Sequence, residues 1–195
     1  MNILVIPEDF RKDQFVLEPI IGAMATNLAR PGRHTLKVKV CWDPILQGVS
    51  EALKWERIQD IFKRYPMVDL FLLCIDRDGQ PGRRDSLDRL EKLAEEFLSQ
   101  DRVLIGENAH QELEVWVLAG CDLPHAWSWP EIRSEVDLKE IYFDPYTQQR
   151  GLMDSPGGGR KLLAQEAARH YRRVRQLCPE DIGNLESRIQ AWIGD

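Results

Sequence analysis

The segment at residues 67–76, MVDLFLLCID, is a nearly continuous apolar run that ends on an aspartate. It lacks the alternation of a half-exposed strand, so it is typical of a central strand covered on both faces. Apolar strands are also predicted at 2–6 and 101–107, and valines alternate with lysines in a half-exposed strand at 35–41. A sheet with such a central strand needs helices on both of its faces.

Helical patterns separate these strands. Apolar residues recur at helical spacing in three segments, at 13–29, 50–65 and 85–100. Asp13, Ser50 and Asp85 are predicted to cap them, and a turn is expected at 30–34. Strand–helix alternation repeated three times predicts a doubly wound, mainly parallel, four-stranded α/β sheet with right-handed crossovers.

The pattern changes after residue 107. We expect a helix capped by Asn108 at 108–120, which completes an α/β domain spanning 1–120. Residues 121–195 are expected to form a loop and helical extension packed on that domain. The extension comprises a Trp- and Pro-rich loop at 121–130, a glycine-rich hinge or tight loop at 155–159, and closing helices at 160–177 and 180–194.

The composition of the 195 residues, 43% hydrophobic and 30% charged, is that of an ordinary globular protein. No apolar run approaches the roughly 20 residues of a membrane span, and the first strand meets an acid at Glu8, unlike a signal peptide. We therefore expect a cytoplasmic protein with no membrane segment. The four cysteines are scattered without metal-ligand spacing, which predicts reduced, structural thiols.

Acidic side chains follow two of the predicted strands. Glu8 comes after the strand at 2–6, and Asp76 and Asp78 come after the central one. Ligands bind at the carboxyl ends of strands in an open parallel sheet. On extended backbone the two aspartates would point the same way, roughly 6–7 Å apart, and a cation such as Mg²⁺ would relieve their repulsion. The alternative is a turn in which Gly79 supplies a positive φ.

Other carboxylates could join this set. Glu114 begins an otherwise apolar segment, EVWVLA, and a carboxylate in such a segment is costly unless it is paired or metal-bound. Glu112 lies two residues earlier and faces another direction on a helix, so we expect it to be the solvent residue. Whether Glu112 or Glu114 faces the site stays open at this stage. Asp13 is either a further ligand or only a helix cap.

Basic residues concentrate between 160 and 175, although the net charge of −6 gives no overall attraction to nucleic acid. This strip suits phosphate contacts, with a solvated helix face as the alternative. Lys161 is the favoured member, because the glycines before it let the backbone approach a phosphate. The segment SPGGGRKLL lacks the spacing of a Walker A loop, so ATP binding is not predicted.

These motifs resemble the Toprim superfamily, the metal-dependent domain of topoisomerases, primases and overcoming-lysogenization-defect nucleases. Its pattern is a glutamate after the first strand, here Glu8, and Asp-x-Asp after a later apolar strand, here within LLCIDRDG. More narrowly, the chain resembles small stand-alone Toprim-like proteins found beside ABC-type ATPases in bacterial defence islands. Those carry Glu-x-Trp-x-Leu-Ala, as at Glu114, and a lysine before a basic helix, as at Lys161. The chain departs at Asp9, where many relatives have glycine.

The resemblance implies Mg²⁺- or Mn²⁺-dependent hydrolysis of a phosphodiester in DNA or tRNA. In that scheme Glu8, Asp76 and Asp78 hold metal, and Glu114 completes a second metal site or orients water. Lys161 contacts a phosphate. The resemblance also implies an effector of an antiviral system with an ABC-type ATPase as partner.

Two rival functions remain. CIDRDGQ also resembles the Asp-x-Asp-Gly motif of haloacid-dehalogenase-type phosphatases, with Asp76 as nucleophile and Asp78 as acid/base. That motif normally ends the first strand and continues with threonine, whereas here it ends the third and continues with Gln80. The other rival is a non-catalytic Toprim-like subunit that docks on an ATPase.

Overall fold

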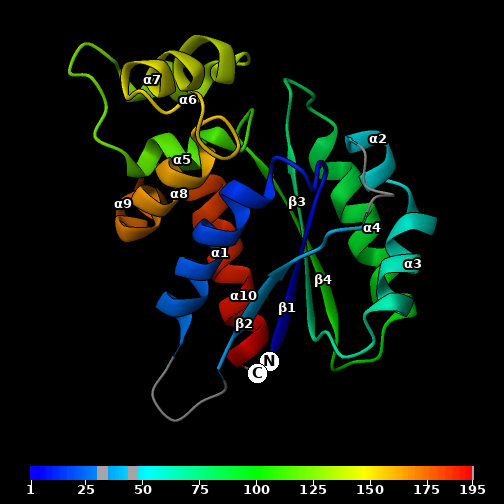
Figure 1. Cartoon of the computed structure of the whole chain (residues 1–195). Coiled ribbons are helices and arrows are strands. Elements are labelled where there is room, and N and C mark those ends of the chain that lie inside the picture. Colours follow the sequence, from blue (N-terminus) through cyan, green and yellow to red (C-terminus); the bar gives the residue numbers. More distant parts are fainter. Residues whose placement is uncertain (30–34, 44–47, 195) are drawn as a thin grey trace.

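Four parallel strands form one sheet in the order β2-β1-β3-β4 in the computed structural model, which describes residues 1–29, 35–43 and 48–194 (Figure 1). The strands are β1 (Asn2–Pro7), β2 (Lys37–Val40), β3 (Leu70–Asp76) and β4 (Val103–Ala109). β1 pairs in parallel with both β2 and β3, and β3 pairs in parallel with β4. Because the chain passes from β2 across β1 to β3, the strand order reverses between β1 and β3. The predicted doubly wound parallel sheet is confirmed.

The strands contribute to two separate cores, because successive side chains of a strand point to opposite faces of the sheet. In β1, Ile3 and Val5 belong to one core, whereas Leu4 and Ile6 belong to the other. All residues of β3 from 70 to 75 are buried, as expected of a strand covered on both faces. β2 lies at an edge and exposes its lysines.

Helices cover both faces of the sheet. Figure 1 shows α3 and α4 on one side of the sheet and α1 on the other. The helices of this part are α1 (Gln14–Leu28), α2 (Val49–Ala52), α3 (Trp55–Arg64) and α4 (Arg83–Phe97). In α3, Ile58, Ile61 and Phe62 are buried, and their helical spacing places them on the face turned to the sheet.

The chain after β4 is largely helical and packs on the α1 side of the sheet. Its elements are α5 (Glu114–Gly120), α6 (Trp129–Ser134), π-helical η1 (Lys139–Phe143), α7 (Asp144–Gln149), α8 (Arg160–Arg169), α9 (Tyr171–Leu177), π-helical η2 (Pro179–Gly183) and α10 (Asn184–Gly194). Leu163, Ala167 and Ile189 belong to the same core as α1 and β3. The extension therefore shares a core with the α/β part. The sequence did not predict α6, η1 and α7.

The helix predicted at 108–120 begins later than expected. β4 continues through Ala109, which pairs with Asp76, so Asn108 lies in a strand and caps no helix. The helix itself starts at Glu114. The apolar pattern of the segment was compatible with a longer helix, but hydrogen bonding to β3 extends the strand instead.

Other helix boundaries also differ from those predicted. The segment at 50–65 forms two helices, because Lys54 has an extended backbone with φ −81° and ψ 125°. α4 begins at Arg83, so Asp85 lies in the first turn and is not the cap. The helix predicted after the glycines divides into α8 and α9 at His170. Local backbone conformation, which apolar spacing does not report, sets each boundary.

All four cysteines are buried and free, as predicted. No helix within 1–29, 35–43 and 48–194 combines the length and the apolar character that crossing a membrane requires. The turn predicted at 30–34 lies outside the described residues.

Candidate functional site

The carboxyl ends of β1 and β3 lie side by side where the strand order reverses, and Pro7 pairs there with Cys74. Glu8 follows β1 directly. Its Oε2 accepts a hydrogen bond from the backbone N–H of Asp76, the last residue of β3, at 3.2 Å. The fold thus brings together two of the acids that the sequence placed at strand ends.

The carboxylate of Asp76 connects the sheet to the start of α5. Its Oδ1 accepts a hydrogen bond from the backbone N–H of Leu113 at 2.7 Å. Burial raises the pKa of Asp76 well above its usual range, and the charges of Glu114, Glu8 and Asp13 raise it further. We refer to Glu8, Asp13, Asp76 and Glu114 as the acidic cluster.

Asp13 joins this cluster although it occupies the N-cap position of α1. Its side chain makes no capping hydrogen bond to the helix. Instead its Oδ2 accepts a hydrogen bond from the backbone N–H of Asp9 at 2.8 Å. Burial first, and then the charges of Glu8 and Glu114, raise the pKa of Asp13 to about 8. The structure therefore shows no capping hydrogen bond from Asp13, and its role as a metal ligand stays a prediction.

Asp78 lies at the rim of the cluster, and its backbone is not extended as the sequence argument assumed. Its φ is +51°, and its side chain is 45% exposed and pairs with Nη2 of Arg83 at 3.3 Å. Gly79 has φ +64°, and its N–H donates to Oε1 of Gln111 at 2.9 Å. The turn with a positive φ at Gly79 is therefore confirmed, and the extended backbone that was expected to align Asp78 with Asp76 is wrong.

Glu114 is buried and forms an ion pair with Arg160 at the start of α8. The two side chains are 8% and 9% exposed, and Nε of Arg160 donates to Oε1 of Glu114 at 2.7 Å. Arg160 Nη2 donates to the same oxygen. Arg160 also donates from Nη1 to the carbonyl oxygen of Gly157 at 2.9 Å and lies over the ring of Phe143. One carboxylate of the cluster thus has its charge balanced from within the protein.

Lys161 and Glu112 lie outside the cluster. Lys161 is exposed in the first turn of α8, and it has no contact with an acid of the cluster among the residues that the structure describes. Glu112 is half-buried instead of being a solvent residue, because it accepts a hydrogen bond from the backbone N–H of Lys139 at 2.6 Å. Burial raises the pKa of Glu112 to about 7. This hydrogen bond connects the first residue of η1 to the segment just before α5.

The cluster has the donor chemistry of a hard cation site. Burial raises the pKa of Glu8 to about 7 and that of Asp13 to about 8, so near neutral pH these two carboxyl groups are in part protonated and a divalent cation would displace the protons. Within the described ranges, no group of three or more His, Cys, Asp or Glu is arranged as a metal cage. Mg²⁺ is commonly held by one or two carboxylates together with waters and substrate phosphates. Glu8 and Asp76 fit that mode.

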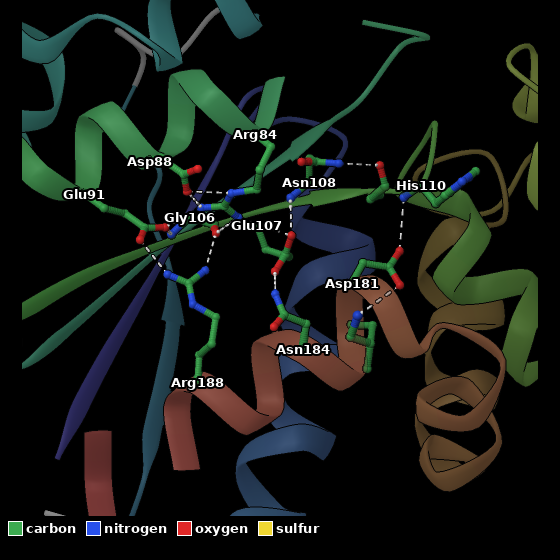
Figure 2. A network of polar contacts seen from close by, with 12 residues as sticks. Arg84, Asp88, Glu91, Gly106, Glu107, Asn108, His110, Asp181, Asn184 and Arg188 are labelled. Atoms are coloured by element: carbon green, nitrogen blue, oxygen red, sulfur yellow. Dashed lines mark hydrogen bonds and ion pairs between the residues drawn. The ribbon is translucent and has the colours of Figure 1, made fainter. Parts of the chain in front are cut away.

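A second polar network joins β4 to the end of the extension (Figure 2). Oε2 of Glu107 accepts a hydrogen bond from Nδ2 of Asn184 at 2.9 Å. The buried carboxylate of Asp181 accepts hydrogen bonds from the backbone N–H of His110 at 3.0 Å and from Nε1 of Trp116 at 2.8 Å. These bonds hold η2 and α10 against the carboxyl end of β4. The network is structural support for the sheet edge that carries the acidic cluster.

Two residues of the site were not predicted from the sequence. The first is Arg160, which the sequence pattern places only in a basic strip whose favoured member is Lys161. The second is Gln111, whose backbone carbonyl and side-chain oxygen accept hydrogen bonds from the turn after β3. The available signal for Arg160 was its place directly after three glycines. Nothing local could show that it would be the buried member of the pair.

Comparisons of the chain with protein-family models, with curated proteins and with solved structures give no match. The function is therefore inferred from the side chains of the site and their arrangement.

Proposed function

We propose that the protein is a divalent-metal-dependent nuclease that hydrolyses phosphodiester bonds in DNA or tRNA. The observation that carries the proposal is the acidic cluster, which gathers four carboxylates from three separate chain segments beside the point where the strand order reverses. Open parallel sheets bind ligands at this place. Carboxyl groups whose pKa values are raised by burial and by one another are typical of functional sites.

The residues take the following roles in this proposal. Glu8 and Asp76 would hold Mg²⁺ or Mn²⁺, and Asp78, at the rim of the cluster, would be the third metal-binding acid. When bound, the cation supplies charge stabilisation for the scissile phosphate and lowers the pKa of a bound water. Glu114, held in place by Arg160, completes a second metal site or orients the attacking water. Lys161 contacts a phosphate of the substrate from the start of α8.

The sequence motifs shared with stand-alone Toprim-like proteins support a cellular context for this activity. In that context the protein is a cytoplasmic effector of antiviral defence, and an ABC-type ATPase is its partner. Co-expression with an ATPase encoded beside it, followed by size-exclusion chromatography, tests the partnership. Separate elution of the two proteins would contradict it.

Metal binding is the first test of the nuclease proposal. Isothermal titration with Mn²⁺ should show binding to the intact protein and no binding to Asp76→Asn, which loses a charged oxygen ligand. Asp101→Asn is the matched control, because Asp101 is exposed and precedes β4, at the opposite end of the strands from the cluster. Absence of Mn²⁺ binding to the intact protein would overturn the proposal.

Cleavage is the second test. Plasmid DNA and tRNA are incubated with the protein and Mn²⁺, and the products are separated by electrophoresis. Cleavage that is lost in Asp76→Asn and kept in Asp101→Asn supports the proposal. Hydrolysis of p-nitrophenyl phosphate without cleavage of either nucleic acid would instead assign a phosphatase of the haloacid-dehalogenase type.

A further inference from the structure

The basic residues of α8 and α9 divide into two groups in the structure. The first group forms ion pairs within the protein. Arg160 pairs with Glu114, Nη1 of Arg173 pairs with Asp122 at 2.9 Å, and Nε of Arg175 pairs with Glu186 at 2.6 Å. The other group comprises Lys161, Arg169 and Arg172. These three are exposed, and none has an acidic partner among the residues that the structure describes. Their charge is therefore available to a ligand.

Arg169 and Arg172 line a groove between α1 and the α8–α9 turn. Its volume is about 940 Å³, far more than a single phosphate fills, and it is open to solvent. The α1 side contributes small or uncharged residues, from Pro19 to Asn27. Arg173 and His170 complete the basic side, and among the residues that the structure describes no Asp or Glu lines the groove. A cationic groove is notable in a chain whose net charge is −6.

Two of the three helices that line the groove, α1 and α8, begin beside the acidic cluster. α8 starts with Arg160, the partner of Glu114, and ends at Arg169 nine residues later, which corresponds to a rise of about 13.5 Å. α1 starts beside Asp13, and its later turns line the groove. Figure 1 shows α1, α8 and α9 together on one side of the sheet. Lys161 lies near the start of this path, and Arg169 lies at its end.

We propose that this groove binds the sugar–phosphate backbone of the nucleic-acid strand that is cleaved at the acidic cluster. The inference rests on the proposed function, and it adds the direction from which the substrate enters. Exposed guanidinium groups without acidic partners suit phosphates, since each contact releases a condensed counterion. A separation of about 13.5 Å corresponds to roughly four nucleotides at about 3.4 Å of duplex axis per phosphate of one strand.

Binding can be measured without metal and hence without cleavage. Fluorescence anisotropy of labelled 20-nucleotide DNA and RNA is recorded in EDTA over a range of salt concentrations. Arg169→Gln/Arg172→Gln should weaken binding of both probes about tenfold at low salt and reduce the salt slope by about two. The matched control is Arg89→Gln/Lys92→Gln, which removes two exposed charges from α4 on the other side of the sheet. The control should bind like the unaltered protein.

The outcomes separate this inference from the nuclease proposal. Unchanged affinity and salt slope in Arg169→Gln/Arg172→Gln would overturn the groove as a backbone site, whatever the cleavage assay shows. Binding that depends on these arginines supports it even if no Mn²⁺-dependent cleavage is found. Phosphatidylserine vesicles serve as a further probe. Arginine-dependent binding to the vesicles without binding to either oligonucleotide would assign the groove to a membrane surface and overturn the inference.

Discussion

Arg160 donates from Nε to Oε1 of Glu114 at 2.7 Å, across 46 residues of chain and with both side chains buried. The pair has two consequences. It ties α8 of the extension to α5, and it balances one negative charge beside the other carboxylates of the cluster. The charges of Glu8, Asp13 and Asp76 are left to protons or to a cation.

Removing one partner of this ion pair should lower the stability of the protein strongly. We expect Arg160→Gln to lower the free energy of unfolding by about 3–5 kcal/mol, because it leaves the charge of Glu114 buried and unbalanced. The double variant Glu114→Gln/Arg160→Gln should be more stable than Arg160→Gln alone, since no uncompensated charge remains. Urea denaturation measures both. Equal stability of the single variant and the unaltered protein would contradict the ion pair.

The acidic cluster predicts how stability depends on pH in EDTA. The folded state raises the pKa of Glu8 to about 7 and of Asp13 to about 8, so it binds more protons than the unfolded chain. The stability that these two groups contribute should therefore be fully present below about pH 4 and be lost as the pH rises through 7 and 8. Added Mn²⁺ should restore stability at pH 8, because it replaces the lost protons.

A variant tests the contribution of Glu8 to this profile. Glu8→Gln should reduce the fall in unfolding free energy between pH 4.5 and 7 by about 3 kcal/mol, the equivalent of the shift in pKa. Glu56→Gln, which alters an exposed carboxyl group on α3, is the control and should leave the profile unchanged. Identical profiles for Glu8→Gln and the control would show that Glu8 is not buried among other acids.

Because α5 packs closely on α8, we expect substitution of Gly120 to destabilise the protein. A Cβ at Gly120 would lie 2.3 Å from Cα of Ala167, so Gly120→Ala requires the two helix backbones to separate. We expect it to lower stability by about 3 kcal/mol. Gly22→Ala in α1 is the control, because nothing lies within 4 Å of its added Cβ, and it should stabilise by about 0.5–1 kcal/mol. Thermal unfolding of the two variants checks the opposite signs.

The buried thiols should not react with Ellman's reagent in the native protein. All four cysteines are buried, and burial raises the pKa of Cys121 to about 12 and that of Cys178 well above its usual range. The reaction requires a thiol that is both accessible and ionised, because thiolate is the reactive species. The native protein meets neither condition. All four should react after unfolding in urea. Rapid release of thionitrobenzoate from the native protein would show that a thiol is accessible.

The sequence was a good guide to the sheet and a poorer one to the extension. The apolar run of β3 and the alternation in β2 report burial on both faces or on one, which is a local property of the strand. The boundary at Asn108 was wrong because the end of β4 depends on pairing with β3. The helices between residues 121 and 159 were missed, since several of them are short and contribute few buried residues each.

The order of residues along the chain was enough to place Glu8 and Asp76 at neighbouring strand ends, because parallel strands carry their carboxyl ends to one edge. It was also enough to mark Glu114 as an acid that needed a partner in an apolar segment. Only the folded chain showed that Arg160 is that partner and that Asp13 turns away from its helix. Such pairings depend on which distant segments pack together. The type and spacing of a residue show that a buried charge needs a partner. Which residue is that partner depends on the long-range packing of the chain.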